Sequence, residues 1–459
     1  MSKNIFDILV VGSGLSSMIF SEEYLKTKKK IHLISPSFKK KYKDNLLKKI
    51  NYRSLPPQLK KNFNKIENYF DYNKIYFNKK NCSLLGSLEF GGLSNYWGLQ
   101  IDKDINEDLN CFGNKIKNEI LECFTEILKE KSLSGKFRNF NNEFKINEFY
   151  EKVIKKNEKK FKNLKIEKSI IALNQNGKNI KQLVPDLILK KIRNKIVFHN
   201  YCVENITKKK NLLYLHCVNE KQKKVFITKK LVLGAGTLVT TKLLMQFLNI
   251  NKEVPIKHHP RLISVYLARN KISSSMKFTP GLFQIKSKKN NDIFSGDIRP
   301  ANKMILDMSL KIYNILKPLK SLFMLFKNYI LFSNNLLGTD FSNLYIKKKG
   351  DKFNIYSKNK MTLKILKNKQ KKIYNYLRNN QIIFPFFKNF FPGIGADYHY
   401  FGTLAVGSKK KLSVNNKCQL HKNKSIYIID GSVLNFKKNL YPYGYVMANA
   451  KRIAKNLKK

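Results

Sequence analysis

The residues that could do chemistry lie in two short segments near opposite ends of the chain. In the first, Gly12 and Gly14 follow an apolar stretch, a strand–turn–helix pattern in which glycine lets the backbone approach a phosphate closely. In the second, His399 precedes an apolar stretch that ends in Asp430 and Gly431. An imidazole is well suited to taking a proton near neutral pH. We therefore expect a dinucleotide-binding turn in the first segment, whereas a lone histidine such as His399 is, by itself, usually a structural residue.

The first segment departs from the usual dinucleotide fingerprint at two places. Its third glycine position is Ser17, so the helix must sit slightly further from the strand. The acidic residue expected at the end of the second strand is replaced by Ser35. A glycine-containing turn in another kind of α/β protein is the alternative interpretation. The cofactor contacts predicted here are Gly12, Ser13, Gly14, Leu15, Ser16 and Ser35.

A glycine-rich segment, residues 85–98, gives the second signal. Its four glycines would weaken a helix or a strand, but they allow the backbone to pass close to a ligand. Trp97, the only Trp of the chain, lies in this segment. A glycine-rich surface loop with a packed Trp is the alternative. The cofactor contacts predicted here are Gly91, Gly92, Ser94, Asn95 and Trp97.

A further apolar strand, glycine turn and helix occupies residues 231–244, after a group of short predicted strands. It repeats the strand–turn–helix pattern of the first segment, which is a weak signal alone, and the family resemblance described below implies that it is a second, adenine-side element. The predicted contacts are Val203, Ala235 and Gly236.

Together these segments resemble the glucose–methanol–choline (GMC) family of FAD-dependent oxidoreductases. Residues 91–98 are similar to the Gly-Gly-x-Ser-x-x-Trp-Gly stretch with which the family wraps the flavin side of FAD. The order and spacing from His399 through Asp430 to the last predicted helix follow the family's ending. The resemblance implies that His399 faces the flavin ring as general base. It also implies that Asp430 and Gly431 contact the pyrophosphate or ribityl region of FAD and that Pro442 lies beside the cofactor.

The resemblance implies oxidation of a CH–OH group by hydride transfer to flavin N5. The amino-acid sequence is most similar to those of bacterial GMC-like members linked to surface-polysaccharide synthesis. This similarity favours an alcohol or sugar-like substrate. Where the family has a second His or Asn, this chain has Tyr441, with Asn439 two residues away. Both complete the predicted catalytic set with His399. The alternatives are a flavoenzyme acting on an amine or acid, and a basic non-catalytic binding protein on a degenerate flavoprotein fold.

The expected fold is α/β: a discontinuous Rossmann-like FAD-binding domain with an inserted α+β substrate domain. Residues 1–102, 193–255 and 395–459 would build the FAD-binding domain, 103–192 a mostly helical insertion, and 256–394 the substrate domain. We expect helices at Ser16–Lys26, Ile116–Leu128 and Phe149–Phe161, and an aromatic loop at Phe384–Phe391. Residues 304–332 would form an amphipathic helix that covers the substrate site or lies on a membrane surface.

The formal net charge of +59 is extreme, and only 8 of the 90 basic residues are Arg. An anionic partner, such as a polyanion or a membrane surface, would explain it, and so would a genome whose base composition favours Lys. Because Arg is the usual residue for reading phosphates and bases, we expect no specific nucleic-acid partner. Peripheral contact with a membrane stays open.

The 6 cysteines form no CxxC pair, which is typical of a reducing compartment and argues against a zinc or iron–sulfur site. No secretory signal and no uninterrupted apolar span stand out. We therefore expect a cytoplasmic protein that could also associate with the inner face of the membrane. The pair His258-His259 lacks an evident third metal ligand, so it predicts a structural role or a crossover that contacts the flavin.

Overall fold

The computed structural model describes the chain in segments. The described residues are 5–27, 30–36, 77–84, 86, 88, 90–95, 97–102, 107–130, 164–168, 170–176, 179–219, 222–270, 283–287, 294–300, 325–358, 362–397, 399–408, 410–437 and 440–458.

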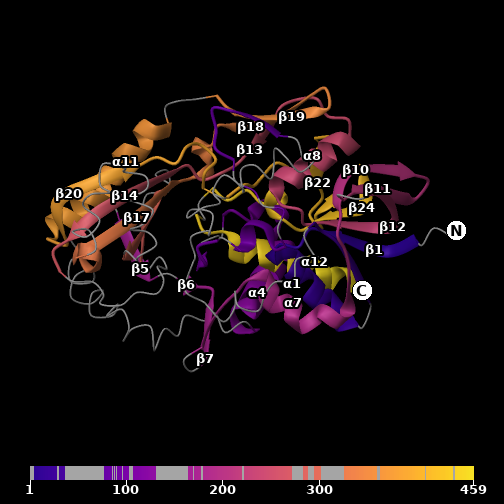
Figure 1. Ribbon diagram of the computed structural model, residues 1–459, viewed down its shortest axis with the longest axis horizontal. Helices are drawn as coiled ribbons and strands as arrows, with labels where there is room; N and C mark the ends of the chain where they lie inside the picture. The colour runs from indigo at the N-terminus through magenta and orange to yellow at the C-terminus, as the bar shows by residue number, and fades with distance from the viewer. Residues whose placement is uncertain are drawn as a thin grey trace.

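A ten-stranded sheet forms one side of the molecule (Figure 1). The five strands β24, β12, β1, β2 and β9 are parallel, and β11 joins β12 in antiparallel pairing. Apolar residues fill the central strands, as expected for a parallel sheet covered on both faces. The path is β21 (Ala405–Val406), β22 (Ser413–Val414), β23 (Gln419–Leu420), β24 (Asn423–Ile428), β12 (Lys223–Leu233), β1 (Ile5–Val11), β2 (Ile31–Ile34) and β9 (Ile196–His199), with β10 (Cys202–Lys209) and β11 (Leu212–Val218) beside it.

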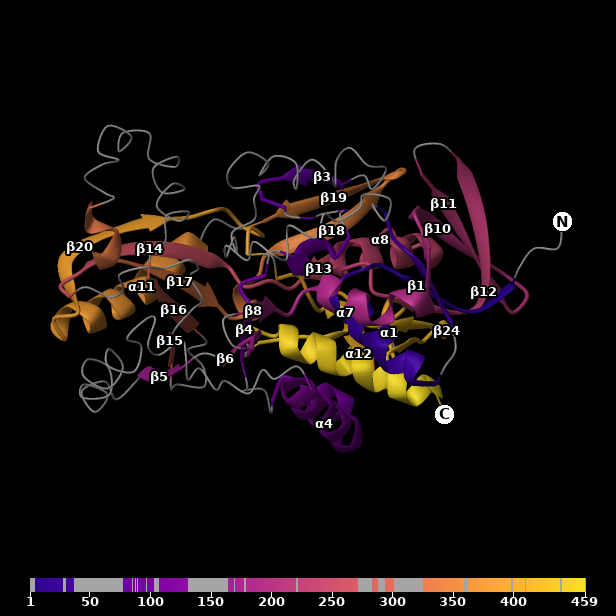
Figure 2. The ribbon, with the colours of Figure 1, turned by 60° about the horizontal axis from the view of Figure 1, so that its bottom comes forward.

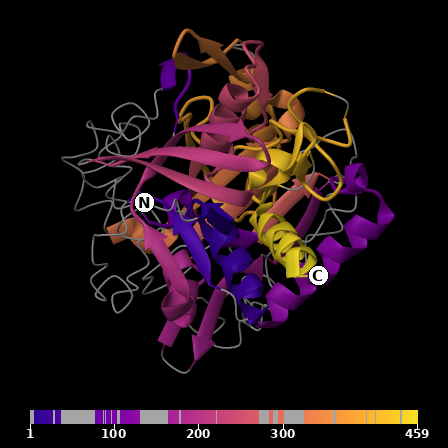
Figure 3. The same cartoon turned by 90° about the vertical axis from the view of Figure 1, so that its right-hand side faces the viewer.

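Helices cover this sheet. Helix α1 (Leu15–Tyr24) connects β1 to β2 and packs against α12 (Tyr443–Lys458) and α7 (Pro185–Ile192). Helix α4 (Asn114–Glu130) lies outside α12, as Figures 2 and 3 show, and α8 (Thr237–Phe247) packs next to β10. The N-termini of α1 and α8 each follow the end of a parallel strand directly, which places two helix N-termini at the same edge of the sheet.

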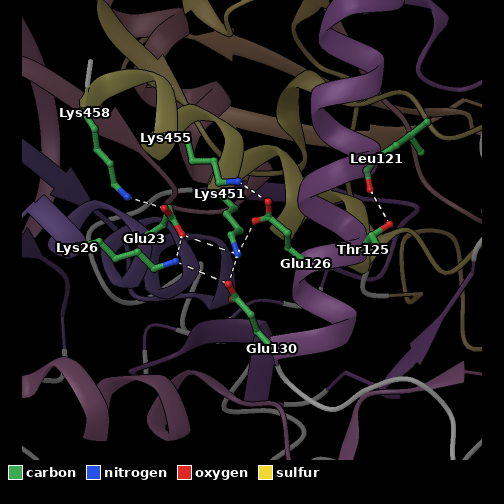
Figure 4. Close-up of polar contacts among 9 residues, drawn as sticks. All are labelled: Glu23, Lys26, Leu121, Thr125, Glu126, Glu130, Lys451, Lys455 and Lys458. Atoms are coloured by element: carbon green, nitrogen blue, oxygen red, sulfur yellow. Dashed lines mark hydrogen bonds and ion pairs between the residues drawn. The ribbon is translucent and has the colours of Figure 1, made fainter.

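An ionic cluster ties α1, α4 and α12 together (Figure 4). Lys451 of α12 is 2% exposed, and its Nζ lies 2.9 Å from a carboxylate oxygen of Glu126 and 2.7 Å from one of Glu130. Lys458 and Lys26 both reach Glu23 of α1, at 2.5 Å and 2.6 Å. Because the ammonium of Lys451 is buried among carboxylates, its charge is paired rather than isolated. The cluster fixes α12 against α1.

Two smaller sheets form the other side (Figure 1). A six-stranded sheet, with α11 (Thr362–Asn379) packed on it, lies at the end of the molecule away from β1. A four-stranded sheet lies between the two regions. The six-stranded order is β20 (Ile383–Phe390), β14 (Arg261–Ala268), β17 (Ile330–Leu337), β16 (Phe294–Pro300), β15 (Phe283–Ser287) and β5 (Leu164–Lys168), and the four-stranded order is β13 (Val254–Ile256), β18 (Leu344–Lys349), β19 (Lys352–Ser357) and β3 (Phe77–Lys80).

Short pieces complete the described chain. A β-bridge pair joins β4 (Gln100–Ile101) to β6 (Ile170–Ile171), and β7 (Leu173–Asn176) forms a hairpin with β8 (Asn179–Gln182). Single 3₁₀ turns lie at Leu25–Thr27, Gly92–Asn95, Asn110–Phe112, Arg193–Lys195, Phe326–Tyr329, Thr339–Phe341 and Gly431–Val433. In the described part of the chain no helix is both long and apolar enough to cross a membrane.

The structure confirms the helix predicted at Ile116–Leu128, which lies within α4, and corrects three other predictions. The predicted aromatic loop at Phe384–Phe391 is mostly strand β20, because aromatic residues suit a pleated surface and β14 offers a pairing edge. Residues 330–332 start β17 instead of ending a helix. Strands β5 to β8 interrupt the region predicted as helical. The helix predicted at Phe149–Phe161 and residues 304–324 lie outside the described residues.

Candidate dinucleotide site and histidine cluster

Four of the predicted segments meet at the carboxyl ends of the parallel strands. Val11, Leu233 and Ile428 are neighbours in register across β1, β12 and β24, and Val11 also pairs with Ile34 of β2. The residues that follow these strand ends therefore share one edge of the sheet. In open α/β sheets this edge is where ligands bind.

The turn after β1 allows no side chain at its first glycine. Gly12 has φ +102°, and a Cβ there would lie 2.2 Å from the carbonyl oxygen of Gly234. Its N–H donates to the carbonyl of Ile34 at 2.9 Å, which fixes the turn between β1 and β2. Gly14 caps α1, and Leu15 and Ser16 are buried in the first turn of that helix. This brings the helix N-terminus to the sheet edge, where its N–H groups form an anion site.

Serine hydroxyls tie this turn to its neighbours. The hydroxyls of Ser13 and Ser35 lie 2.9 Å apart, so the residue that replaces the usual acid bonds back to the glycine turn. The N–H of Gly91 donates to Ser13 Oγ at 3.0 Å. The N–H of Leu15, first in the helix, donates to Ser94 Oγ at 3.0 Å. The glycine-rich segment thus lies directly on the N-terminus of α1.

The glycine-rich segment also contacts the start of α12. Gly91 and Gly92 have φ +85° and +52°, left-handed values that glycine adopts readily. The Ser94 hydroxyl lies 2.5 Å from the phenol oxygen of Tyr443, the first residue of α12. Asn95 turns back and donates from its amide to the carbonyl of Phe90 at 2.6 Å.

Trp97 is partly buried next to the same helix. Its Nε1 donates to the carbonyl of Leu183 at 3.1 Å, and its ring lies 4.9 Å from that of Tyr443, centroid to centroid. Pro442 immediately precedes α12, and its carbonyl accepts from the N–H of Tyr445 at 2.9 Å. Trp97 and Pro442 therefore both lie at the N-terminal end of α12.

The second glycine turn meets the Asp430 segment. Asp430 is 4% exposed and accepts from the N–H of Ser432 at 3.0 Å and from the hydroxyl of Thr240 at 2.5 Å. The backbone N–H of Gly236 bonds to it as well. Burial raises the pKa of Asp430, and these hydrogen bonds act in the opposite direction. The carboxylate therefore locks the N-terminus of α8 to the turn that follows β24.

The other residues predicted around this turn lie beside it. Gly236 has φ +83° and caps α8, and a Cβ there would meet nothing within 4 Å. Ala235 is partly buried one residue earlier. Val203 is 5% exposed on β10, the strand against which α8 packs. Gly431 has no room for a side chain, because a Cβ would lie 2.8 Å from the carbonyl oxygen of Tyr400.

His399 contacts His259, a pairing that the sequence did not predict. Its Nδ1 lies 3.2 Å from Nδ1 of His259, and Nε2 of His259 lies 3.0 Å from the carbonyl oxygen of Phe436. A carbonyl only accepts, so His259 carries its proton on Nε2, and its Nδ1 accepts from His399. The free lone pair of His399 is then on Nε2. The pair thus leaves His399 with an acceptor nitrogen on the opposite side of its ring.

A buried aspartate orients the segment that carries His259. Asp397 accepts from Nδ1 of His258 at 3.0 Å and from the backbone N–H of His259 at 2.8 Å. Burial acts to raise the pKa of Asp397, but the neighbouring histidines, led by His258, hold it below its usual value. The adjacent His258-His259 pair was visible in the sequence, but its link to Asp397 joins positions 139 residues apart.

Burial keeps both histidines of the pair neutral. It lowers the pKa of His399 to about 4 and, together with the nearby His399, that of His259 to about 3. His399 keeps partial solvent exposure, whereas His259 is fully buried. Near pH 7, His399 therefore presents an unprotonated nitrogen. The described residues contain no group of three or more His, Cys, Asp or Glu arranged to hold a metal ion.

Tyr441 lies beside His399 and bonds to a second buried aspartate. The two rings are 6.5 Å apart, and the phenol of Tyr441 donates to Asp297 at 3.0 Å. Asp297 also accepts from Arg299 Nε at 2.9 Å and from the backbone N–H of Asn334 at 3.0 Å. Burial, together with the charge of Asp297, raises the pKa of Tyr441 well above its usual value. Asn439 lies outside the described residues.

The proton of Tyr441 is therefore committed to Asp297. The phenol does not have a second proton to donate. Asp297 comes from β16 of the six-stranded sheet, a region in which the sequence predicted no site residue. Only the long-range contact reveals it.

Comparison with solved structures identifies the architecture. The crystal structure of pyridoxine 4-oxidase from Mesorbium loti matches with a TM-score of 0.58, over 98% of this chain and 99% of that chain, at 11% sequence identity. The chain has the fold of pyridoxine 4-oxidase. The predicted class, an α/β fold with a Rossmann-like domain, is confirmed. No protein-family model matches the chain, and no curated protein matches it in sequence.

The residues at the sheet edge fit a dinucleotide such as FAD. Gly12 and Gly14 keep side chains away from the N-terminus of α1, and Gly236 leaves open space at that of α8. The N-terminus of α1, with the hydroxyls of Ser13 and Ser94 beside it, suits a pyrophosphate. Ser35 offers the ribose a hydroxyl where a carboxylate is usual.

Proposed function

We propose that this protein is an FAD-dependent oxidoreductase of the GMC type that oxidises a CH–OH group. One observation carries the proposal: the glycine turns at Gly12 and Gly236 and the buried Asp430 share one sheet edge. The residue expected to act as base, His399, lies near that edge through the pairing of residues 402–404 with residues 431 and 432. The fold shared with an oxidase supports the same class.

In this proposal His399 Nε2 takes the hydroxyl proton of the substrate. As that O–H bond breaks, the C–H bond on the same carbon breaks with its electron pair and a C=O bond forms. FAD, when bound at the sheet edge, would supply the two-electron acceptor for this electron pair. Because burial lowers the pKa of His399 to about 4, its Nε2 is unprotonated near pH 7 and able to accept a proton.

Tyr441 would form part of the same site. Its ring lies 6.5 Å from that of His399, centroid to centroid, and Asp297 holds its proton, so it would shape the site rather than donate a proton. We propose an alcohol or sugar-like substrate, as the family resemblance of the sequence implies. We also propose a cytoplasmic location, from the cysteine pattern of the sequence.

The first test is the visible absorption spectrum of the purified protein, recorded before and after denaturation. The proposal predicts a yellow protein that releases FAD. A colourless protein that also does not bind added FAD would overturn the proposal and favour a basic binding protein. A yellow protein is then screened anaerobically with sugars and alcohols for bleaching of the flavin absorbance.

The second test is His399→Ala, with His421→Ala as the matched control. His421 is an exposed histidine of the same domain. His399→Ala should keep its flavin and slow flavin bleaching by substrate roughly 10²–10⁴-fold, the usual effect of removing a positioned base. His421→Ala should bleach at the unmodified rate. Equal rates in both variants would contradict the assignment of His399.

A further inference from the structure

The six-stranded sheet exposes apolar side chains at one corner, far from the dinucleotide edge. The aromatic patch consists of Leu325, Phe326, Phe384, Phe386 and Phe387, which are 75%, 46%, 41%, 58% and 37% exposed. They come from β20 and from the turn before β17 (Figure 1). Soluble proteins seldom expose large apolar side chains in such a group, and a group of this kind marks a contact surface.

Strand pairing explains why these side chains gather. On one edge of β14, Tyr266 pairs with Phe387 and Ala268 with Ile383, so residues 384–386 lie opposite the single residue Leu267. This bulge turns residues 384–386 out of the regular strand. On the other edge, Leu267 pairs with Ile330, which places Leu325 and Phe326 at the same end of the sheet.

The elements around the aromatic patch carry only positive charge. In α11, β14, β17 and β20 there is no Asp or Glu. Arg269 lies with its guanidinium 5.2 Å from the ring of Phe384, and Lys388 is exposed on β20. Helix α11 touches the patch through Tyr374, whose ring is 4.4 Å from that of Phe387. Its exposed cations are Lys364, Lys367, Lys371, Lys372 and Arg378.

From these observations we propose that the aromatic patch is a docking surface for an anionic lipid bilayer. Aromatic and aliphatic side chains would enter the headgroup boundary, while the surrounding Lys and Arg residues would meet the lipid phosphates. The exposed aliphatic residue Leu325 favours a bilayer over a nucleic acid, because a leucine cannot stack on a base.

The same strand argues against a second copy of the chain as the occupant. An edge strand pairs with another chain through a regular row of backbone groups. Here Pro385 removes one donor, the bulge breaks the row, and Lys388 puts a charge on the edge. These are the features with which proteins prevent edge-to-edge pairing.

The test is co-sedimentation of the full chain with vesicles of phosphatidylcholine alone and of phosphatidylcholine mixed with phosphatidylglycerol. We expect binding only to the mixed vesicles. The double variant Phe384→Ser, Phe386→Ser should lower the partition coefficient by about tenfold or more, from the apolar surface lost. Its control is Ile5→Ser, Val225→Ser, two equally exposed apolar residues of the ten-stranded sheet, which should bind normally.

A second pair of variants tests the charges. Arg269→Glu with Lys388→Glu should weaken binding to mixed vesicles by about tenfold or more, since two cations that would face the lipid phosphates are replaced by anions. Lys208→Glu with Lys209→Glu on β10 makes the same change in net charge elsewhere and should have little effect.

Three results would overturn the proposal. Equal loss in both charge variants would mean that net charge alone attracts the vesicles. Unchanged binding of the Phe384→Ser, Phe386→Ser variant, with an unchanged melting temperature, would exclude the patch. A shift of that variant from dimer to monomer in gel filtration would make a second copy the occupant. None of these readouts depends on bound FAD.

Discussion

Replacing Asp430 by Asn should destabilise the protein even though the two side chains have nearly the same shape. One carboxylate oxygen accepts from the N–H of Ser432 at 3.0 Å and from its hydroxyl at 2.5 Å. The other accepts from the hydroxyl of Thr240 at 2.5 Å, and the N–H of Gly236 also bonds to this carboxylate. An amide has one oxygen, so its NH₂ must face one of these two sets of donors.

The size of the destabilisation follows from the backbone N–H donors, which cannot reorient. A hydroxyl can rotate and accept from the new NH₂, but a backbone N–H cannot. One backbone N–H, of the buried Ser432 or of the exposed Gly236, therefore loses its acceptor, which costs about 1–3 kcal/mol where the N–H is shielded from water. The remaining bonds lose their charge assistance, while the amide avoids the burial of a charge, and we take these two effects as offsetting. The free energy of unfolding should fall by about 2 kcal/mol.

The assay is thermal unfolding followed by circular dichroism. With an unfolding entropy of about 2 cal/mol/K per residue, a chain of 459 residues gives about 1 kcal/mol/K, so the melting temperature should fall by about 2 °C. Asp7→Asn is the matched control, because Asp7 is an exposed aspartate whose side chain is 86% accessible, and it should change the melting temperature little. Equal melting temperatures for Asp430→Asn and the unmodified protein would refute the locking role of Asp430.

Three other perturbations test the site. Gly12→Ala places a Cβ 2.2 Å from a backbone oxygen and should lower both the melting temperature and the flavin content, whereas Gly113→Ala, at φ +76° with open space, should cost only about 1 kcal/mol of backbone strain. His259→Phe removes the acceptor of the His399 Nδ1 proton. It should slow flavin bleaching about fivefold to tenfold, which corresponds to the free energy of one hydrogen bond. An effect as large as that of His399→Ala would contradict a positioning role for His259. The pKa values of about 3 and 4 for these histidines lie below the ordinary 6.5, so below pH 6.5 the unfolded chain binds more protons. The free energy of unfolding should therefore fall as the pH drops from 6.5 toward 4, by up to about 1.4 kcal/mol per pH unit for each histidine. The fall should be smaller in His259→Phe, which lacks one of the two histidines. A melting temperature that stays constant over this pH range would exclude these pKa shifts.

The parts of the fold that the sequence predicted depend on local patterns. The strand before Gly12 and the strand before Gly236 are apolar runs that stop at a glycine, and the structure has β1 and β12 there. The helix predicted around Ile120 is amphipathic and needs no partner to be recognised. Such signals are complete within about 15 residues of chain.

The parts that were missed depend on pairing between distant segments. Strand β20 has five aromatic or proline residues among its eight, a composition that a loop can share, and only its pairing with β14 makes it a strand. The partners of His399 and Tyr441, which are His259 and Asp297, lie 140 and 144 residues away in the chain. The assignments of the site residues to cofactor and catalysis stay predictions until the flavin and the variants are measured.

Ser17 departs from the glycine fingerprint of dinucleotide-binding turns, and a glycine far away in the chain compensates for it. Ser17 occupies the third glycine position and is fully buried, with its hydroxyl 3.4 Å from the carbonyl oxygen of Gly234, to which it donates. A Cβ at Gly234 would lie 2.3 Å from that hydroxyl, so the glycine after β12 provides the space that a glycine in α1 usually provides. The close packing of helix on sheet is therefore kept, with its glycine moved to the neighbouring strand. A fingerprint divided between two segments 217 residues apart cannot be read along either one alone.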